Sequence, residues 1–177
     1  TWLRHRWFSL LSKQSVPTIL DAGALYLAGK LDQPTLITPH AGELARLLTE
    51  RGITVTSEAI EGNPKKWAVA ASEKLGVVVL LKGSHTVVAD GDSVIELPVS
   101  TPWLATAGSG DVLAGIVGAL VATNYIEILN SPQRLADVAA AGAYIHNQAA
   151  VLASSGAPIS ASQIIDQIPV VLRKILK

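Results

Sequence analysis

The stretch ATAGSGDVL at residues 105–113 runs from a loop of small residues into an apolar helix, which we expect at about 111–121. Gly108 and Gly110 let the backbone approach a ligand closely and adopt turns that other residues resist. Unpaired N–H groups at the start of a helix, together with the helix dipole, favour an anion at that place. The stretch therefore predicts a site for a phosphate group, or for the charge that develops on a phosphoryl group during transfer.

Asp111 stands at the same helix start. A carboxylate beside an anion site can accept the proton of a hydroxyl group that attacks phosphorus. The competing interpretation is structural, with Ser109 capping the helix and Asp111 complementing its dipole. Taken alone, the GSGD motif favours neither interpretation. The helix favours the functional one slightly, because a broad apolar face would fix it in the core as a rigid support; that face comprises Val112, Leu113, Ile116, Val117 and Leu120.

Segments with strand and helix character alternate on both sides of this loop. We expect strands at 16–20, 34–38 and 76–83, a hairpin at 85–97, and helices at 65–75, 132–154 and 160–176. Such alternation predicts an α/β fold with a mainly parallel central sheet. The chain of 177 residues is expected to form a single domain over residues 1–177, because domains commonly have about 100–200 residues.

A second candidate segment, TPHAGE at residues 38–43, follows a predicted strand and so lies at the edge where open α/β sheets bind ligands. Thr38 as N-cap and Pro39 as the first helical residue predict a helix that begins here. His40 and Glu43 then share one face of its first turn. Without further information, His40 is more often a residue of the helix cap than a ligand contact.

A third candidate segment surrounds Lys82, which ends an apolar strand where a cation is unexpected without a partner. A nucleotide phosphate or base edge is one candidate partner, and a carboxylate from a neighbouring element is the other. Asp21 follows the strand at 16–20 in the same way, and its alternative role is a cap for the next turn. His146 and Asn147 lie inside a predicted helix and are interpreted as packing residues. The chain contains neither a P-loop nor a GxGxxG motif.

The composition excludes several classes of protein. Apolar residues make up 49% of the chain and charged residues 16%, which excludes a disordered chain and suggests that partner subunits cover part of the surface. Lys plus Arg and Asp plus Glu are balanced at 14 each. The chain therefore has no excess of basic residues that would indicate binding to nucleic acid. The absence of cysteine excludes disulfides, thiolate zinc sites and a thiol nucleophile, and it fits a reducing, cytoplasmic location.

No apolar run reaches the roughly 18 residues that span a bilayer, so we expect no membrane partner. The opening residues 1–14, TWLRHRWFSLLSKQ, are basic and place Leu3, Trp7, Leu10 and Leu11 at helical spacing. They predict an amphipathic helix rather than a signal or transit peptide, because they lack a long apolar core and a small-residue cleavage site.

The chain contains, in this order, the segments LDAGAL (20–25), TPHAGE (38–43), VVLLKGSHTVVAD (78–90), PWLATAGSGDVLAGIVGAL (102–120) and GAPISASQIIDQIP (156–169). Each segment is weakly specific alone, but together they resemble the ADP- or ATP-dependent NAD(P)H-hydrate dehydratases of the ribokinase-like superfamily. The resemblance covers most of the chain from about residue 16. It implies a ribokinase-like three-layer sandwich and a metabolite-repair enzyme, a hydro-lyase, that restores NADH or NADPH from the hydrated forms NAD(P)HX.

The resemblance also implies the chemistry and the residues that carry it. ADP or ATP phosphorylates the added hydroxyl group of NAD(P)HX, phosphate leaves, and the ring double bond returns. Asp111 would deprotonate that hydroxyl group and contact the substrate, His40 would also contact the substrate, and the anion hole would comprise Gly108, Ser109 and Gly110. The adenine nucleotide, with Mg²⁺ on its phosphates, would contact Gly110 and the segment Lys82, Gly83, Ser84, His85 and Thr86.

As partners, the resemblance implies a homo-oligomer, such as a tetramer, and an NAD(P)HX epimerase. The chain departs from the family in two places. Gly23 stands where the family often has the second Asp of an Asp-Ala-Asp motif, and nothing matches the N-terminal portion of the family, which we therefore expect to be missing. Two other functions stay open: a ribokinase-like kinase for a vitamin precursor or a sugar, and an inactive fragment that serves as an oligomerisation or partner-binding module.

Overall fold

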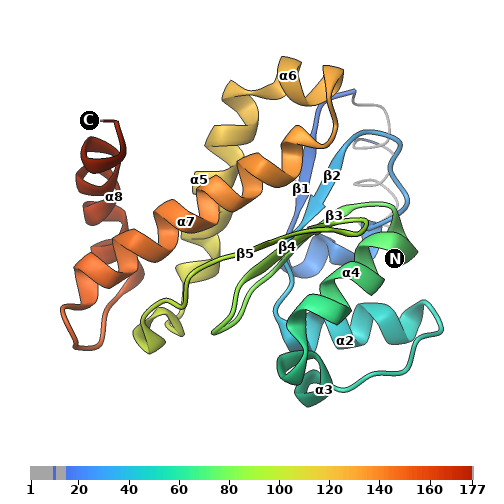
Figure 1. Ribbon diagram of the computed structural model, residues 1–177, viewed down its shortest axis with the longest axis horizontal. Coiled ribbons are helices and arrows are strands. Elements are labelled where there is room, and N and C mark those ends of the chain that lie inside the picture. Colours follow the sequence, from blue (N-terminus) through green and yellow to red (C-terminus); the bar gives the residue numbers. More distant parts are fainter. Residues whose placement is uncertain (1–9, 11–14, 177) are drawn as a thin grey trace.

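The computed structural model describes residue 10 and residues 15–176, so the predicted helix at 1–14 lies almost entirely outside the described residues. Figure 1 shows the arrangement of the elements. In chain order they are β1 (Thr18–Leu20), the 3₁₀ helix η1 (Ala22–Leu27), β2 (Thr35–Ile37), α2 (Ala41–Glu50), α3 (Ser57–Gly62), α4 (Pro64–Leu75), β3 (Val78–Leu81), β4 (Val87–Asp90), β5 (Ser93–Glu96), the 3₁₀ helix η2 (Pro102–Leu104), α5 (Ser109–Thr123), α6 (Tyr125–Asn130), α7 (Arg134–Ser154) and α8 (Ala161–Ile175). The predicted strands and helices agree with these bounds to within a few residues.

The five strands form one sheet in the order β1-β2-β3-β4-β5. β1, β2 and β3 run parallel, whereas β4 and β5 form a hairpin that continues the sheet in antiparallel fashion. The predicted parallel sheet is thus found in β1 to β3, and the hairpin makes the whole sheet mixed. The hairpin prediction is confirmed: the chain turns at Gly91, whose φ of 57° lies in the left-handed region.

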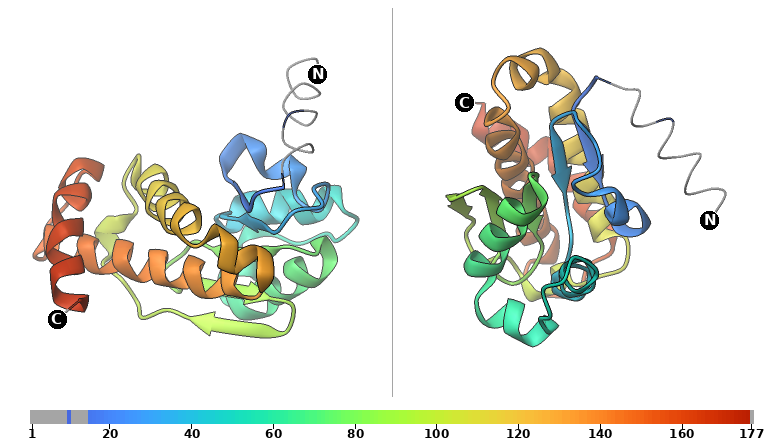
Figure 2. Two further views of the ribbon diagram at one scale, coloured as in Figure 1. Left: turned by 90° about the horizontal axis from the view of Figure 1, so that it is seen from above. Right: turned by 90° about the vertical axis from the view of Figure 1, so that its right-hand side faces the viewer.

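Helices cover both faces of the sheet and give three layers (Figures 1 and 2). Because side chains alternate along a strand, Ile37 and Val79 face a core shared with α2, α3 and α4. Leu36 and Leu80 face the opposite core, which α5, α6 and α7 complete. α8 packs against α7 and α5 in a third cluster. None of the helices that the structure describes has the length and apolar character needed to cross a membrane.

The start of α2 differs from the prediction. His40, not Thr38, is the N-cap, and Ala41 rather than Pro39 is the first helical residue. The His40 ring accepts from the N–H groups of Gly42 and Glu43, while the hydroxyl group of Thr38 donates to Oδ1 of Asp21 at 2.8 Å. This hydrogen bond joins the end of β2 to the end of β1.

α5 and α7 approach each other closely. A Cβ atom on Gly142 of α7 would lie 2.7 Å from Cγ2 of Val117 on α5. Packed atoms do not tolerate that distance, so any other residue would require neighbouring atoms to shift. Leu113 and Val117 are buried along this contact. The contact holds α5 against α7 and thereby fixes the position of the loop that precedes α5.

Candidate functional site

The ends of β1, β2 and β3 and the start of α5 meet around the ammonium group of Lys82. Its Nζ lies 3.0 Å from Oδ1 of Asp21 and 3.9 Å from Oε2 of Glu43. A Cβ atom on Gly110 would lie 3.6 Å from the same nitrogen, so the ammonium group also stands beside the first turn of α5. The backbone N–H of Lys82 donates to the carbonyl oxygen of Pro39 at 2.8 Å. The three candidate segments of the sequence therefore converge on one place.

The first turn of α5 offers backbone donors without a capping side chain. Gly108 is the N-cap with a φ of 83°, and no side chain of the described residues caps the helix. The interpretation of Ser109 as the cap is wrong, because Ser109 is already the first helical residue and its N–H donates to Thr106 O at 3.2 Å. The next two N–H groups, those of Gly110 and Asp111, lie where a helix has no partners of its own, so an anion would meet them.

A cavity of about 680 Å³ opens beside this turn. Its volume lies in the range of small-molecule sites, which is about 300–1,000 Å³. The wall combines the segment after β3, the loop around η2, the start of α5 and the middle of α7. Of the predicted site residues it brings together His40, Lys82, Gly83, Ser84, Thr86, Ser109 and Gly110.

Three predicted site residues lie outside this wall. His85 lines a neighbouring hollow of about 380 Å³, which shares His40 and Lys82 with the cavity. Gly108 forms the turn behind the cavity, where its Cβ position would lie 3.2 Å from Cβ of Ala161. Asp111 lines a different hollow, an apolar groove of about 540 Å³ between α5, α7 and α8.

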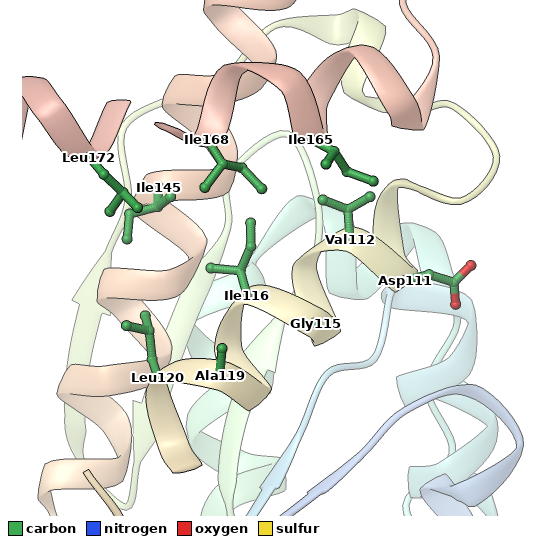
Figure 3. A pocket seen from close by; sticks show the side chains of 10 residues that line it. All are labelled: Asp111, Val112, Gly115, Ile116, Ala119, Leu120, Ile145, Ile165, Ile168 and Leu172. Carbon is green, nitrogen blue, oxygen red and sulfur yellow. The ribbon is translucent and has the colours of Figure 1, made fainter. Parts of the chain in front are cut away.

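Figure 3 shows Asp111 at the end of that groove, with its carboxylate directed away from Val112 and Ile165. The side chain is exposed on the first turn of α5. Ser109 and Gly110 of this turn thus line the cavity, whereas Asp111 lines the groove.

His40 caps α2. Its Nδ1 accepts from the N–H groups of Gly42 at 3.1 Å and Glu43 at 3.4 Å, and Oε2 of Glu43 accepts from the backbone N–H of His40 at 2.9 Å. Because Nδ1 is an acceptor, the neutral ring carries its proton on Nε2, which lies 3.5 Å from the same carboxylate oxygen. The side chain is 58% exposed, so part of the ring stays accessible to a ligand.

Two residues of α7 in the cavity wall were not predicted as site residues. His146 and Asn147 are both buried. The Asn147 amide donates to Pro98 O, and the Ser100 hydroxyl donates to Asn147 O, each at 3.4 Å, so α7 fastens the loop that leads to η2. Burial, with a smaller contribution from the Lys82 ammonium group, lowers the pKa of His146 to about 4. The sequence feature that could have identified these two residues is a polar pair inside an otherwise apolar stretch of helix.

The three layers, the glycine turn at the start of α5 and the adjoining cavity define a ribokinase-like fold. A ribokinase-like superfamily protein from Enterococcus faecalis shares it with a TM-score of 0.74 at 21% identity, over 97% of this chain and 58% of that chain. The family model described as NAD(P)H-hydrate dehydratase matches residues 4–170, and the chain belongs to this family. The family expected from the sequence motifs is therefore confirmed.

Two relatives illustrate the match. The bifunctional NAD(P)H-hydrate repair enzyme Nnr of Corynebacterium glutamicum is 38% identical over 191 residues, which cover 94% of this chain and 33% of the relative. The ADP/ATP-dependent NAD(P)H-hydrate dehydratase from Bacillus subtilis, co-crystallised with ATP and Mg²⁺, superimposes with a TM-score of 0.80 at 25% identity, over 98% of this chain and 60% of that chain. The chain thus spans about a third of the first relative and about 60% of the second.

Proposed function

We propose that the protein acts in the ADP- or ATP-dependent dehydration of hydrated NADH and NADPH, and that this chain supplies the phosphoryl-transfer site. The observation that carries the proposal is the position of Lys82 Nζ beside the first turn of α5, at the wall of the cavity. An ammonium group and two backbone N–H groups gathered at one place stabilise the charge on a phosphoryl group. The Bacillus subtilis relative, co-crystallised with ATP and Mg²⁺, supports an adenine nucleotide as the ligand.

The nucleotide would occupy the cavity with its phosphates toward Gly110 and Lys82. Val99, Pro102 and Leu104 give the same wall an apolar surface that suits a base. Gly83, Ser84, His85 and Thr86 would flank the nucleotide. The Thr86 hydroxyl group donates to Gly83 O at 3.2 Å and so closes the turn on which these residues lie.

Mg²⁺ would reach the site together with the nucleotide. It prefers oxygen ligands and is commonly held by phosphates, water and one or two carboxylates. Among the described residues no group of three or more His, Cys, Asp or Glu side chains is arranged to hold a metal ion. The carboxylates that contact Lys82, those of Asp21 and Glu43, are the proposed protein contribution.

Asp111 would accept the proton of the substrate hydroxyl group. Its carboxylate stands on the same helix turn as the proposed phosphate donors. As the proton leaves, the substrate oxygen bonds to phosphorus and the bond from phosphorus to the nucleotide breaks. In the second step the carbon–oxygen bond breaks, phosphate leaves with the electron pair, and the ring loses a proton to restore its double bond.

An NAD(P)HX epimerase is a proposed partner, because the Corynebacterium glutamicum relative is named a bifunctional repair enzyme. The homo-oligomer, the single domain and the cytoplasmic location stay predictions. They play no part in the experiment that tests the reaction.

The test measures the return of reduced-nicotinamide absorbance when hydrated NADH is supplied with ADP or ATP and Mg²⁺. The unmodified protein should restore NADH, and Asp111→Asn should lower the rate by about 10²–10⁴-fold, the usual contribution of a general base. Asp137→Asn is the matched control, since Asp137 is another exposed acid in the first turn of a helix, here α7. It should keep the full rate.

The other outcomes assign other functions. Equal rates in the unmodified protein and in Asp111→Asn would exclude Asp111 as the base. A phosphorylated alcohol as the final product would indicate a ribokinase-like kinase. Absence of both products and of nucleotide binding would favour the partner-binding module.

A further inference from the structure

Thr38 is a buried polar residue for which the proposed reaction has no use. It directly follows β2, is 1% exposed and lines neither the 680 Å³ cavity nor the 380 Å³ hollow. Its hydroxyl group donates to Oδ1 of Asp21 at 2.8 Å. A hydrogen bond to a charged group is stronger than one between neutral groups, so this bond restricts the carboxylate that accepts it.

The sheet brings this hydroxyl group to Asp21. The N–H of Thr38 donates to the carbonyl oxygen of Leu20 at 3.2 Å, so the parallel pairing of β1 and β2 continues one residue past β2. The N–H of Lys82 donates to the carbonyl oxygen of Pro39 at 2.8 Å and continues the next pairing in the same way. These bonds fix the backbone at the strand ends, whereas the direction of the Asp21 carboxylate depends on its side-chain partners.

The Asp21 carboxylate has a competing position. Asp21 is the N-cap residue of η1, where an aspartate side chain commonly accepts from the N–H groups of the first helical turn. It makes no capping bond of this kind with the described residues. The next residue, Ala22, has a φ of 45°, which costs free energy for a residue that has a side chain. The chain thus has neither a cap nor a relaxed backbone where it directs this carboxylate to Lys82.

We propose that Thr38 is a positioning residue that, by holding Oδ1 of Asp21, keeps the Lys82 ammonium group beside the first turn of α5. Without the hydroxyl group, the Asp21 side chain can turn back toward the N–H groups of η1, and Nζ loses its partner at 3.0 Å. The ammonium group is then left with Glu43 on α2, whose Oε2 lies 3.9 Å away. This arrangement of side chains stands without a ligand, while its effect on nucleotide binding rests on the proposed function.

A spectroscopic test needs no ligand. Thr38→Val keeps the shape of the side chain without the hydroxyl group, and Thr38→Ser keeps the hydroxyl group. The NMR order parameter of the Lys82 Cε group reports how firmly the side chain is held, and its signal is identified by its loss in Lys82→Met. The order parameter should fall in Thr38→Val and stay near its original value in Thr38→Ser. The same value in all three proteins would overturn the proposal.

Nucleotide binding gives a second test, measured by isothermal titration with ADP and adenosine. Thr38→Val should raise the dissociation constant of ADP by about three- to tenfold and change that of adenosine little, while Thr38→Ser should keep most of the affinity. Thr35→Val is the matched control, because Thr35 is also buried on β2 and its hydroxyl group donates to Gln33 O at 2.9 Å. It should bind ADP as the unmodified protein does. Equal weakening of ADP binding by the two valine variants would indicate a structural role and overturn the proposal.

A double-mutant cycle shows whether Thr38 acts through Lys82. In the Lys82→Met protein, Thr38→Val should weaken ADP binding no further, because the contact that it disturbs is already absent. Additive losses in the double variant would overturn the proposal. An unmodified protein in which the Lys82 order parameter responds to Thr38→Val, but which does not bind ADP, would contradict the proposed function alone.

Discussion

The ammonium nitrogen of Lys82 lies 3.0 Å from Oδ1 of Asp21, although 61 positions separate the two residues in the chain. The same oxygen accepts a hydrogen bond from the Thr38 hydroxyl at 2.8 Å. One carboxylate thus connects the ends of three parallel strands, because Asp21, Thr38 and Lys82 follow β1, β2 and β3. Asp21 holds the cation beside the start of α5, where a phosphate group would meet it.

Replacing Lys82 should weaken nucleotide binding selectively. Lys82→Met removes a charge-assisted contact to phosphate, so the dissociation constant of ADP should rise by about tenfold or more, while that of adenosine should change little. Isothermal titration with both ligands measures this difference. Lys65→Met is the matched control, because Lys65 also forms an ion pair, with Glu96 at 3.1 Å, but on an exposed surface. Equal weakening of ADP and adenosine by Lys82→Met would contradict a phosphate contact.

Gly108 should be required for catalysis beyond its effect on stability. Its φ of 83° disfavours a side chain, and its Cβ position is 3.2 Å from Ala161. Gly156 has a similar φ of 90° with nothing within 4 Å of its Cβ position. Alanine at either position should lower the free energy of unfolding by about 1–2 kcal/mol through backbone strain.

Only Gly108→Ala should also lower kcat, since only Gly108 shapes the turn before the proposed donors. Urea denaturation and the NADH recovery assay on both variants provide the comparison. If Gly156→Ala lost as much activity as Gly108→Ala, the effect would come from lower stability and not from the turn.

The contact between α5 and α7 predicts opposite signs for two glycines in helices. Gly142→Ala places a Cβ atom 2.7 Å from Val117 Cγ2 and should destabilise the protein by about 1–3 kcal/mol through overpacking. Gly118 has nothing within 4 Å of its Cβ position, so Gly118→Ala should stabilise by about 0.5–1 kcal/mol through helix propensity. Urea denaturation of both variants measures the two changes in the free energy of unfolding. Destabilisation of equal size in both would refute the close contact.

Local patterns in the sequence predicted the elements whose causes are themselves local. The hairpin at 85–97 was predicted, and α4 ends at Leu75, the predicted last residue of that helix. The start of α2 was predicted wrongly, because the His40 ring, and not the Thr38 hydroxyl group, accepts from the first free N–H groups of the helix. The short helix α6 was not predicted, since its few residues carry no clear period.

The segments of the candidate site were predicted, but their mutual arrangement was not. Positions at strand ends identified Asp21, His40 and Lys82 as neighbours of one sheet edge. Sequence spacing does not reveal that Asp111 lines the groove and not the cavity, because that depends on how α5 is rotated against α7. Nor does it reveal His146, which reaches the site from another helix.

The burial of His146 predicts a dependence of stability on pH. Its pKa falls from 6.5 to about 4 on folding, so the unfolded chain binds more protons between these values. The free energy of unfolding therefore rises with pH across this window. Above it the ring is neutral in both states and contributes no pH dependence. Near pH 4.5 the ring should cost the folded state about 2 kcal/mol relative to neutral pH.

Comparison with His146→Asn isolates this contribution, because carboxyl groups titrate alike in both proteins. Urea denaturation of each protein near neutral pH and near pH 4.5 gives two differences in unfolding free energy. The unmodified protein should lose about 2 kcal/mol more than His146→Asn on acidification. Equal losses would mean that the folded protein protonates His146 as readily as the unfolded chain does, and that burial does not hold the ring neutral.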